Sequence, residues 1–432
     1  MADRTRTDTH TMVTARIAAV LTAAAISLCA AAAPPPDTMT GALNERVRTL
    51  QVTDEAGMPA DLPLVSLYDR LPRLGIEFDV LRDDRDYLRY RLVHCDATWR
   101  PTPIAEIEYI DGFNEAAVEN YAYSGATTVP YTHYRIDFPT PDMQPLKSGN
   151  YLHQVYHEND PDDVWAQVRL YVSEQTAAVE ADLTGRTDID YNDAHQQLSL
   201  AVDVERAGVA DPFNELLVAV QQNGRCDNEV MLRHPLRANR STAVYEHVPQ
   251  LVFEGGNEYR RFETVSVRYP GMHVESISWA EPYYHFTLAT DTPRAEDSYS
   301  YDSTQAGRYL VRTQDSSDST LDADYAVVHF SLDMPQLPGA MVFLDGDLTS
   351  RRFDPEALMT FNPETGLYER AMLLKQGSYN YQYLVVPAGA ARGYTAPAEG
   401  DFFQTRNEYA VRVYHRPPGA RFDRLIAVAL IR

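Results

Sequence analysis

The chain has little lysine, cysteine or tryptophan, and its basic residues are far outnumbered by acidic ones. Lys147 and Lys375 are the only lysines in 432 residues, and the formal net charge is −24. Nucleic-acid binding needs a basic face, and an anionic membrane surface repels this charge. The acidic residues are spread evenly, which indicates a solvated exterior. We therefore expect no nucleic-acid partner and no direct lipid binding.

Long hydrophobic runs are also scarce. The one clear run, Ile17 to Cys29, follows Arg16 and leads to the small residues Ala30 to Ala33 before Pro34. This pattern is typical of an export signal, and the run is too short to remain in a bilayer as a spanning helix. We predict a signal peptide over residues 1–33, a flexible Pro-rich leader over 34–45 and a soluble exported product.

Only three cysteines occur, and the predicted signal peptide contains one of them. Export to an oxidising compartment would permit a disulfide between Cys95 and Cys226. The two residues lie in what we predict to be different domains. We therefore expect two buried free thiols.

Residue patterns of metal sites and hydrolases are missing as well. His94, Cys95 and Asp96 are adjacent, but neighbours on a strand point to opposite faces and cannot easily share one ion. No CxxC, HExxH or GxSxG pattern accompanies them. We expect His133 and His153, which lie in aromatic strands, to be structural.

Two further motifs have ordinary explanations. Asp345 and Asp347 flank Gly346 in a predicted turn, and Gly255-Gly256 lacks the Lys and Ser/Thr of a phosphate loop. We interpret both segments as turns. The sequence thus predicts no catalytic, cofactor-binding or metal-ligating residue, no cofactor and no enzymatic activity.

Aromatic residues are abundant, with 28 tyrosines in the chain, and many of them alternate with polar residues. Short alternating runs bounded by Pro, Gly and Asp predict an all-β protein of tandem Ig-like β-sandwich domains. We expect an N-terminal sandwich over residues 46–175, a middle sandwich over 176–322 and a C-terminal Ig-like sandwich of the early-set type over 323–432. Residues 314–322 read as a loop or interdomain linker, and short helical turns are expected at 104–109 and 115–120.

Tyr379, Tyr381 and Tyr383 are spaced two apart, so their rings should share one face of a strand. Aromatic strands can stack sugars, and the third unit resembles the Ig-like glycogen-binding modules of starch-active enzymes. Those modules usually carry a Trp here, whereas this chain has none after Trp279. We therefore keep a periplasmic or cell-surface carbohydrate-binding protein only as the alternative hypothesis for the function.

Seven motifs occur in a characteristic order along the chain: HCDATW (94–99), EYIDGF (108–113), YTHY (131–134), SGNY (148–151), QNGR (222–225), GGNEYRRF (255–262) and LKQGSYNYQY (374–383). Together they resemble the plug protein family of the type IX secretion system. The resemblance covers residues 45 to 385. The segment from Tyr123 to Thr128 departs from the bulkier sequence that the family favours.

The resemblance implies a non-enzymatic subunit that closes the periplasmic opening of a large outer-membrane translocon barrel. It also implies a periplasmic location, peripheral to the inner face of the outer membrane, with the barrel as partner. Interface residues remain unassigned. As a first hypothesis, exposed turns at Asn223-Gly224 or Gly255-Gly256 contact the barrel.

Overall fold

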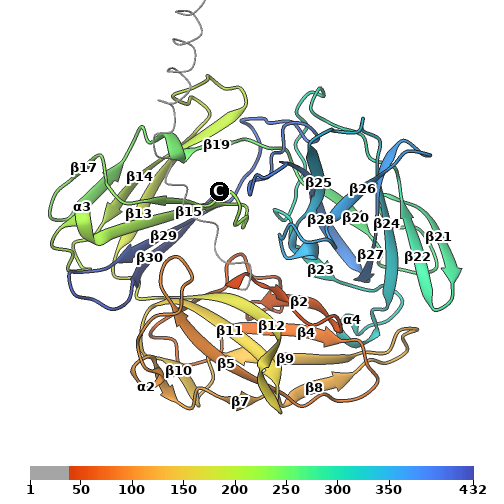
Figure 1. The fold of residues 1–432 in the computed structure, drawn as a ribbon, viewed down its shortest axis with the longest axis horizontal. Helices are drawn as coiled ribbons and strands as arrows, with labels where there is room; N and C mark the ends of the chain where they lie inside the picture. Colours follow the sequence, from red (N-terminus) through yellow and green to blue (C-terminus); the bar gives the residue numbers. More distant parts are fainter. Residues whose placement is uncertain (1–37) are drawn as a thin grey trace, which may run out of the picture. The chain divides into compact units, whose positions relative to one another are not determined.

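The computed structural model describes residues 38–432 and is shown in Figure 1. The predicted signal peptide and the first part of the predicted leader lie outside the described residues. About 47% of the chain is strand and 5% is helix. The predicted all-β class is therefore confirmed, with tandem sandwich-like units. The specific Ig-like arrangement of strands stays a prediction.

The N-terminal lobe comprises residues 38–175. A six-stranded sheet, β1-β12-β11-β5-β7 with β3 beside β12, faces a four-stranded sheet, β2-β4-β9-β8, and β6 pairs with β10. Apolar side chains from both large sheets form one cluster, which makes this lobe a sandwich. Its strands are β1 (Gly41–Ala42), β2 (Val47–Thr53), β3 (Leu64–Ser66), β4 (Leu74–Val80), β5 (Leu88–Cys95), β6 (Ile110–Gly112), β7 (Ala116–Ala117), β8 (Asn120–Tyr123), β9 (Thr132–Phe138), β10 (Met143–Pro145), β11 (Gly149–His157) and β12 (Asp160–Ser173).

The middle lobe comprises residues 176–255 and 404–432. A five-stranded sheet, β13-β14-β18-β17 with β19 beside β14, faces a four-stranded sheet, β16-β15-β29-β30. One apolar cluster lies between them. The strands are β13 (Ala178–Thr184), β14 (His195–Asp203), β15 (Leu216–Gln222), β16 (Val230–Leu232), β17 (Arg237–Ala238), β18 (Thr242–Tyr245), β19 (Val252–Glu254), β29 (Tyr409–His415) and β30 (Arg424–Ile431).

The inserted lobe comprises residues 256–403 and is built on a nine-stranded sheet. The order is β20-β28-β25-β26-β27-β24-β22-β21, with β23 beside β28. Strands from both ends of this order contribute to one apolar cluster, so the sheet curls around its own core. The strands are β20 (Arg260–Glu263), β21 (Val274–Ala280), β22 (Tyr283–Leu288), β23 (Tyr309–Val311), β24 (Tyr325–Leu332), β25 (Ala340–Asp345), β26 (Leu358–Asn362), β27 (Leu367–Lys375) and β28 (Gly377–Pro387).

This strand pairing corrects the predicted boundary between 322 and 323. β29, which was expected in a C-terminal domain of 323–432, pairs with β15, which was expected in the middle domain of 176–322. β20 and β23 precede the boundary but pair with β28, which follows it. The strands alternate in the same way on both sides of 322, so the sequence gives no sign of which strand pairs with which. We propose a domain division that follows the three lobes.

Residues 314–322, predicted as a loop or linker, belong to the inserted lobe and include α4 (Ser319–Asp322). Asp318 caps α4, because its carboxylate accepts hydrogen bonds from the backbone N–H groups of Thr320 and Leu321.

The predicted flexible leader, residues 34–45, is ordered in its described part. Gly41 and Ala42 form β1, which pairs with β12. Thr38 is buried, and the Arg169 side chain donates a hydrogen bond of 2.8 Å to its carbonyl oxygen. The Pro-rich composition predicts a flexible tether, but this segment instead adds β1 to the edge of the N-terminal sheet beside β12.

Helices are short. The predicted turn at 104–109 is confirmed as α2 (Glu106–Tyr109), and α3 (Pro212–Glu215), η2 (Pro249–Leu251) and η3 (Asp347–Thr349) complete the set with α4 for residues 38–432. The helix expected at 115–120 is wrong, because β7 and β8 extend the two sheet edges there. None of the helices in the described chain has the length and hydropathy needed to cross a membrane.

Candidate functional site

Of the adjacent residues His94, Cys95 and Asp96, the first two are buried and Asp96 is partly exposed. His94 contacts Thr102 Oγ1 through Nδ1 at 2.8 Å and the Ser148 carbonyl oxygen through Nε2 at 3.2 Å. Burial lowers the pKa of His94 to about 4 and raises that of Cys95 to about 12. His94 is therefore a neutral, hydrogen-bonded packing residue at physiological pH. Within residues 38–432 no group of three or more His, Cys, Asp or Glu side chains is arranged to hold a metal ion.

His153 is also internal, and its ring stacks on Tyr90 with 5.1 Å between centroids. Burial lowers the pKa of His153 to about 3, so the ring is neutral. Neither ring nitrogen has a geometric hydrogen-bond partner among the described residues. The sequence interpretation of His153 as structural agrees with this position, although the unpaired nitrogens make it a costly packing residue.

His133 is part of a buried polar junction between the N-terminal and inserted lobes. The junction centres on the Asp79 carboxylate of β4. Its Oδ1 lies 2.8 Å from His133 Nδ1, and its Oδ2 accepts hydrogen bonds of 2.6 Å from both Lys375 Nζ and the Tyr325 hydroxyl. The Asp79 and Lys375 side chains are 1% and 2% exposed. Two of the three groups that surround Asp79 come from the inserted lobe.

The charge balance keeps Asp79 ionised. Burial by itself would raise the pKa of Asp79, but the Lys375 ammonium and the His133 ring together lower it below its usual range. Lys375 Nζ also donates a hydrogen bond of 2.8 Å to the Thr320 carbonyl oxygen, and it lies 4.0 Å from the centroid of the Tyr131 ring. Every strong group here has a partner, so the junction has one well-defined geometry.

Tyr131 and Thr128 of the N-terminal lobe extend this junction. The Tyr131 hydroxyl donates to the carbonyl oxygens of Thr320 at 2.9 Å and Ala323 at 3.0 Å. Asp324 accepts hydrogen bonds from both the backbone N–H and the hydroxyl of Thr128. The loop that carries α4 is thereby attached to the N-terminal lobe at several points.

A second junction, between the N-terminal and middle lobes, contains an apolar cluster beside polar contacts such as the hydrogen bond of 2.8 Å from the Tyr414 hydroxyl to Asn150 Oδ1. It contains Leu152 and Tyr171 on one side and Leu217 and Leu425 on the other, all in one buried cluster. This packing explains why β12 is buried along its C-terminal half on both faces. The two lobes are joined here by removal of apolar area from water.

The chain crosses between the middle and inserted lobes at Gly255-Gly256. These glycines are buried, so the hypothesis that they form an exposed contact turn is wrong. The returning segment covers them: Phe402 N–H donates to the Gly256 carbonyl oxygen at 2.8 Å and Asn407 Nδ2 to that of Gly255 at 2.7 Å. A Cβ on Gly255 would lie 2.3 Å from the Phe402 carbonyl oxygen, so only glycine fits.

Asn223-Gly224 does form the predicted turn, and both residues have positive φ. Asn223 is nevertheless buried, since its side chain bonds Asn407 Oδ1 at 2.7 Å and the Glu408 backbone N–H at 2.8 Å. Gly224 is exposed. The turn therefore points its asparagine inward and exposes its glycine, and the contact expected of this turn stays a prediction.

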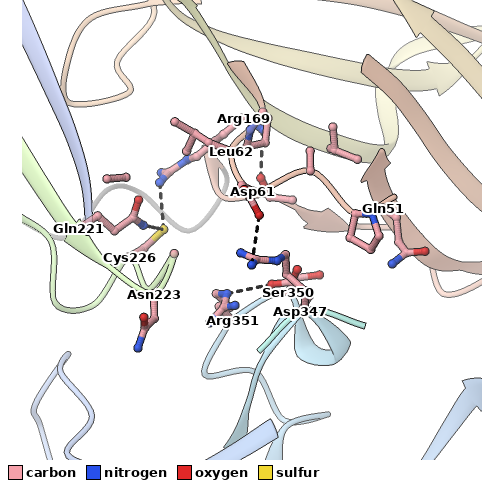
Figure 2. A pocket seen from close by; sticks show the side chains of 18 of the residues that line it. Gln51, Asp61, Leu62, Arg169, Gln221, Asn223, Cys226, Asp347, Ser350 and Arg351 are labelled. Atoms are coloured by element: carbon pink, nitrogen blue, oxygen red, sulfur yellow. Dashed lines mark hydrogen bonds and ion pairs between the residues drawn. The ribbon is translucent and has the colours of Figure 1, made fainter. Parts of the chain in front are cut away.

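A cavity of about 180 Å³ is lined by residues of all three lobes and is shown in Figure 2. Asp61 of the N-terminal lobe, Arg308 of the inserted lobe and Glu408 of the middle lobe line it. Arg308 lies 3.2 Å from Asp61 and 2.7 Å from Glu408. Arg432 pairs with the same two carboxylates. These ion pairs connect the three lobes, but the Asp61 side chain is 46% exposed.

On the remaining walls, Arg351 pairs with Asp347 at 2.8 Å, and Arg169 and Gln221 both point to the Cys226 sulfur, as Figure 2 shows. Cys226 is a free, partly buried thiol, and Cys95 is a free, fully buried one. The expectation of free thiols is confirmed, while full burial holds for Cys95 only.

The turn at Asp345-Gly346-Asp347 is confirmed, since Asp347 starts η3. Asp345 itself is buried and accepts a hydrogen bond of 2.8 Å from Gln382.

Tyr379, Tyr381 and Tyr383 share one face of β28, as predicted, and that face is the core. The three tyrosines are 2%, 0% and 0% exposed. The hydroxyls of Tyr381 and Tyr383 each donate a hydrogen bond of 2.7 Å to the Asp291 carboxylate. Rings buried in this way cannot stack on a sugar, so the carbohydrate-binding reading is not favoured.

The polar groups at the lobe junctions could not be identified from the sequence. Asp79 and Arg169 are charged residues in strands that also carry other charges, and neither belongs to a recognisable motif. Lys375 did carry a signal, because it is one of only two lysines and follows a strand rich in apolar residues. A rare charge in such a place marks a paired, buried group.

Comparisons with known proteins identify the family. The family model described as the type 9 secretion system plug protein 1st domain matches residues 47–174, which lie within the N-terminal lobe. A crystal structure at 2.30 Å of a hypothetical protein from Parabacteroides merdae ATCC 43184 is 40% identical, with a TM-score of 0.89. That match covers 91% of this chain and 99% of the other. Among curated proteins, none matches the chain. The chain belongs to the type IX secretion system plug protein family.

Proposed function

We propose that this chain closes the periplasmic opening of the outer-membrane translocon barrel of the type IX secretion system. The observation that carries the proposal is the family match over residues 47–174. The family name describes a secretion component and no catalytic activity. The proposed location is the periplasm, peripheral to the inner face of the outer membrane.

The physical requirement for a closing subunit is a broad body that does not deform under load. A barrel wide enough for folded cargo would leak solutes when empty. The three junctions described above support such a body, since they combine apolar packing, a buried ion pair and a double crossing of the chain. Residues 38–432 also fall within one compact unit.

Affinity purification from outer-membrane extracts tests the proposal. The tagged full chain should recover a large barrel protein of the secretion system, whereas a periplasmic protein of similar size with the same tag should not. Recovery of no barrel protein by the tagged chain, under conditions that keep the barrel intact, contradicts the proposed partner.

A further inference from the structure

Arg169 of β12 is a buried cation with no carboxylate at ion-pair distance among residues 38–432. Three arginines are buried in the described chain: Arg169, Arg225 and Arg412. Arg225 pairs with Asp227 at 2.6 Å, and Arg412 pairs with Glu229. Arg169 lies within ion-pair distance of no carboxylate among residues 38–432. Buried charges are normally paired, so Arg169 departs from the rule that the other two follow.

The contacts that Arg169 does make leave part of its guanidinium unused. Nε and Nη2 donate to the carbonyl and hydroxyl oxygens of Thr38, at 2.8 and 3.3 Å, and Nη1 lies 3.4 Å from the Cys226 sulfur. The group also lies 4.3 Å from the centroid of Trp99. A guanidinium has five N–H donors, so two of them have no partner among the described residues.

Arg169 also lines the cavity of about 180 Å³ between the three lobes, which has room for a small solute. The other charged groups of that wall are already neutralised. Asp61 and Glu408 pair with Arg308 and Arg432, and Asp347 pairs with Arg351. Gln221 adds an amide beside Cys226. The cavity therefore has room, further polar groups and one cation that no carboxylate of the described residues compensates.

We propose that this cavity binds a small oxyanion, a phosphate or a carboxylate group, through Arg169. The oxyanion accepts hydrogen bonds from the free guanidinium N–H groups, and charge-assisted bonds of this kind are among the strongest that arginine forms. Because residues of all three lobes line the cavity, the bound anion stabilises their arrangement. This inference does not depend on the proposed sealing role.

Thiol labelling tests it on the unmodified chain. Cys226 lines the cavity and is partly exposed, whereas Cys95 is buried and provides an internal reference. Inorganic phosphate, acetate and malonate are titrated against chloride at matched ionic strength. At ten times its dissociation constant, the bound anion should slow alkylation of Cys226 about tenfold. Protection by phosphate alone or by carboxylates alone identifies the group that binds. Equal labelling in all four salts overturns the proposal.

Variants provide the second measurement. Phosphate or malonate should raise the thermal midpoint of the unmodified chain, and Arg169→Gln should lose that rise together with the thiol protection. Arg268→Gln, at a side chain that is 75% exposed, is the matched control and should keep both. The same rise in Arg169→Gln contradicts binding at this cavity. If Arg169→Gln does not fold, the labelling result decides by itself.

Discussion

The junction of the N-terminal lobe with the inserted lobe contains a buried ion pair, and its junction with the middle lobe contains a buried apolar cluster. Asp79 and Lys375 are almost fully buried at the first junction, and so is Leu425 at the second. An apolar contact weakens in proportion to the area lost, whereas a buried charge left alone costs far more than the pair contributed. The Asp79–Lys375 pair thus specifies one arrangement of the two lobes that it joins, and the apolar cluster contributes to the stability of the other junction.

The largest effect should follow from Asp79→Leu. This change leaves the Lys375 ammonium buried without its counter-charge and should lower the free energy of unfolding by about 3–5 kcal/mol. Urea denaturation followed by tryptophan fluorescence measures it. The double variant Asp79→Leu/Lys375→Met should recover most of the loss. A double variant as unstable as the single one contradicts the assignment of the cost to the unpaired charge.

Leu425→Ala probes the apolar junction. Leu425 is 0% exposed, so removal of its side chain should cost about 2–5 kcal/mol in the same assay. The loss should be the same in low and high salt, because the removed side chain carries no charge. A cost below 1 kcal/mol (roughly the effect of a surface substitution) would show that the cluster does not hold the two lobes together.

Acid should distinguish the two junctions. The folded-state pKa of Asp79 lies below its unfolded value of about 3.9. Its stabilising contribution is therefore present above that value and is lost as the pH falls through the lower folded pKa. Between about pH 4 and 2 the unmodified chain should lose more stability than the Asp79→Leu/Lys375→Met variant. Leu425→Ala should parallel the unmodified chain, and parallel curves for all three would contradict the role of Asp79.

Asp61→Asn should have the smallest effect. Asp61 pairs with Arg308 and Arg432, but its side chain is 46% exposed, so water and salt screen both pairs. We expect a loss below about 1 kcal/mol that disappears in 1 M salt. A larger loss that persists in high salt would place the Asp61 pairs in the same class as the Asp79 junction.

Local features of the fold could be predicted from sequence. The spacing of Tyr379, Tyr381 and Tyr383 placed the three rings on one strand face, and the Asn223-Gly224 turn was recognised by its residue types. These patterns depend on residues next to one another in the chain. Which face is the core and which turn is buried depend on distant segments, such as the one around Asn407 that covers Gly255.

Pairings between distant strands could not be predicted. β29 and β15 both read as buried apolar strands, and nothing in either states that they pair. The same holds for the four junction residues. Asp79, His133, Tyr325 and Lys375 come together only after four strands, β4, β9, β24 and β27, are placed. The family resemblance, in contrast, depended on motif order alone and is confirmed.

Outer-membrane permeability tests the central claim most directly. Cells that lack this chain should admit a large hydrophilic probe, and removal of the translocon barrel as well should restore the barrier, because the leak then has no path. Equal probe entry with and without the chain, while the barrel is present in the membrane, would contradict a sealing role.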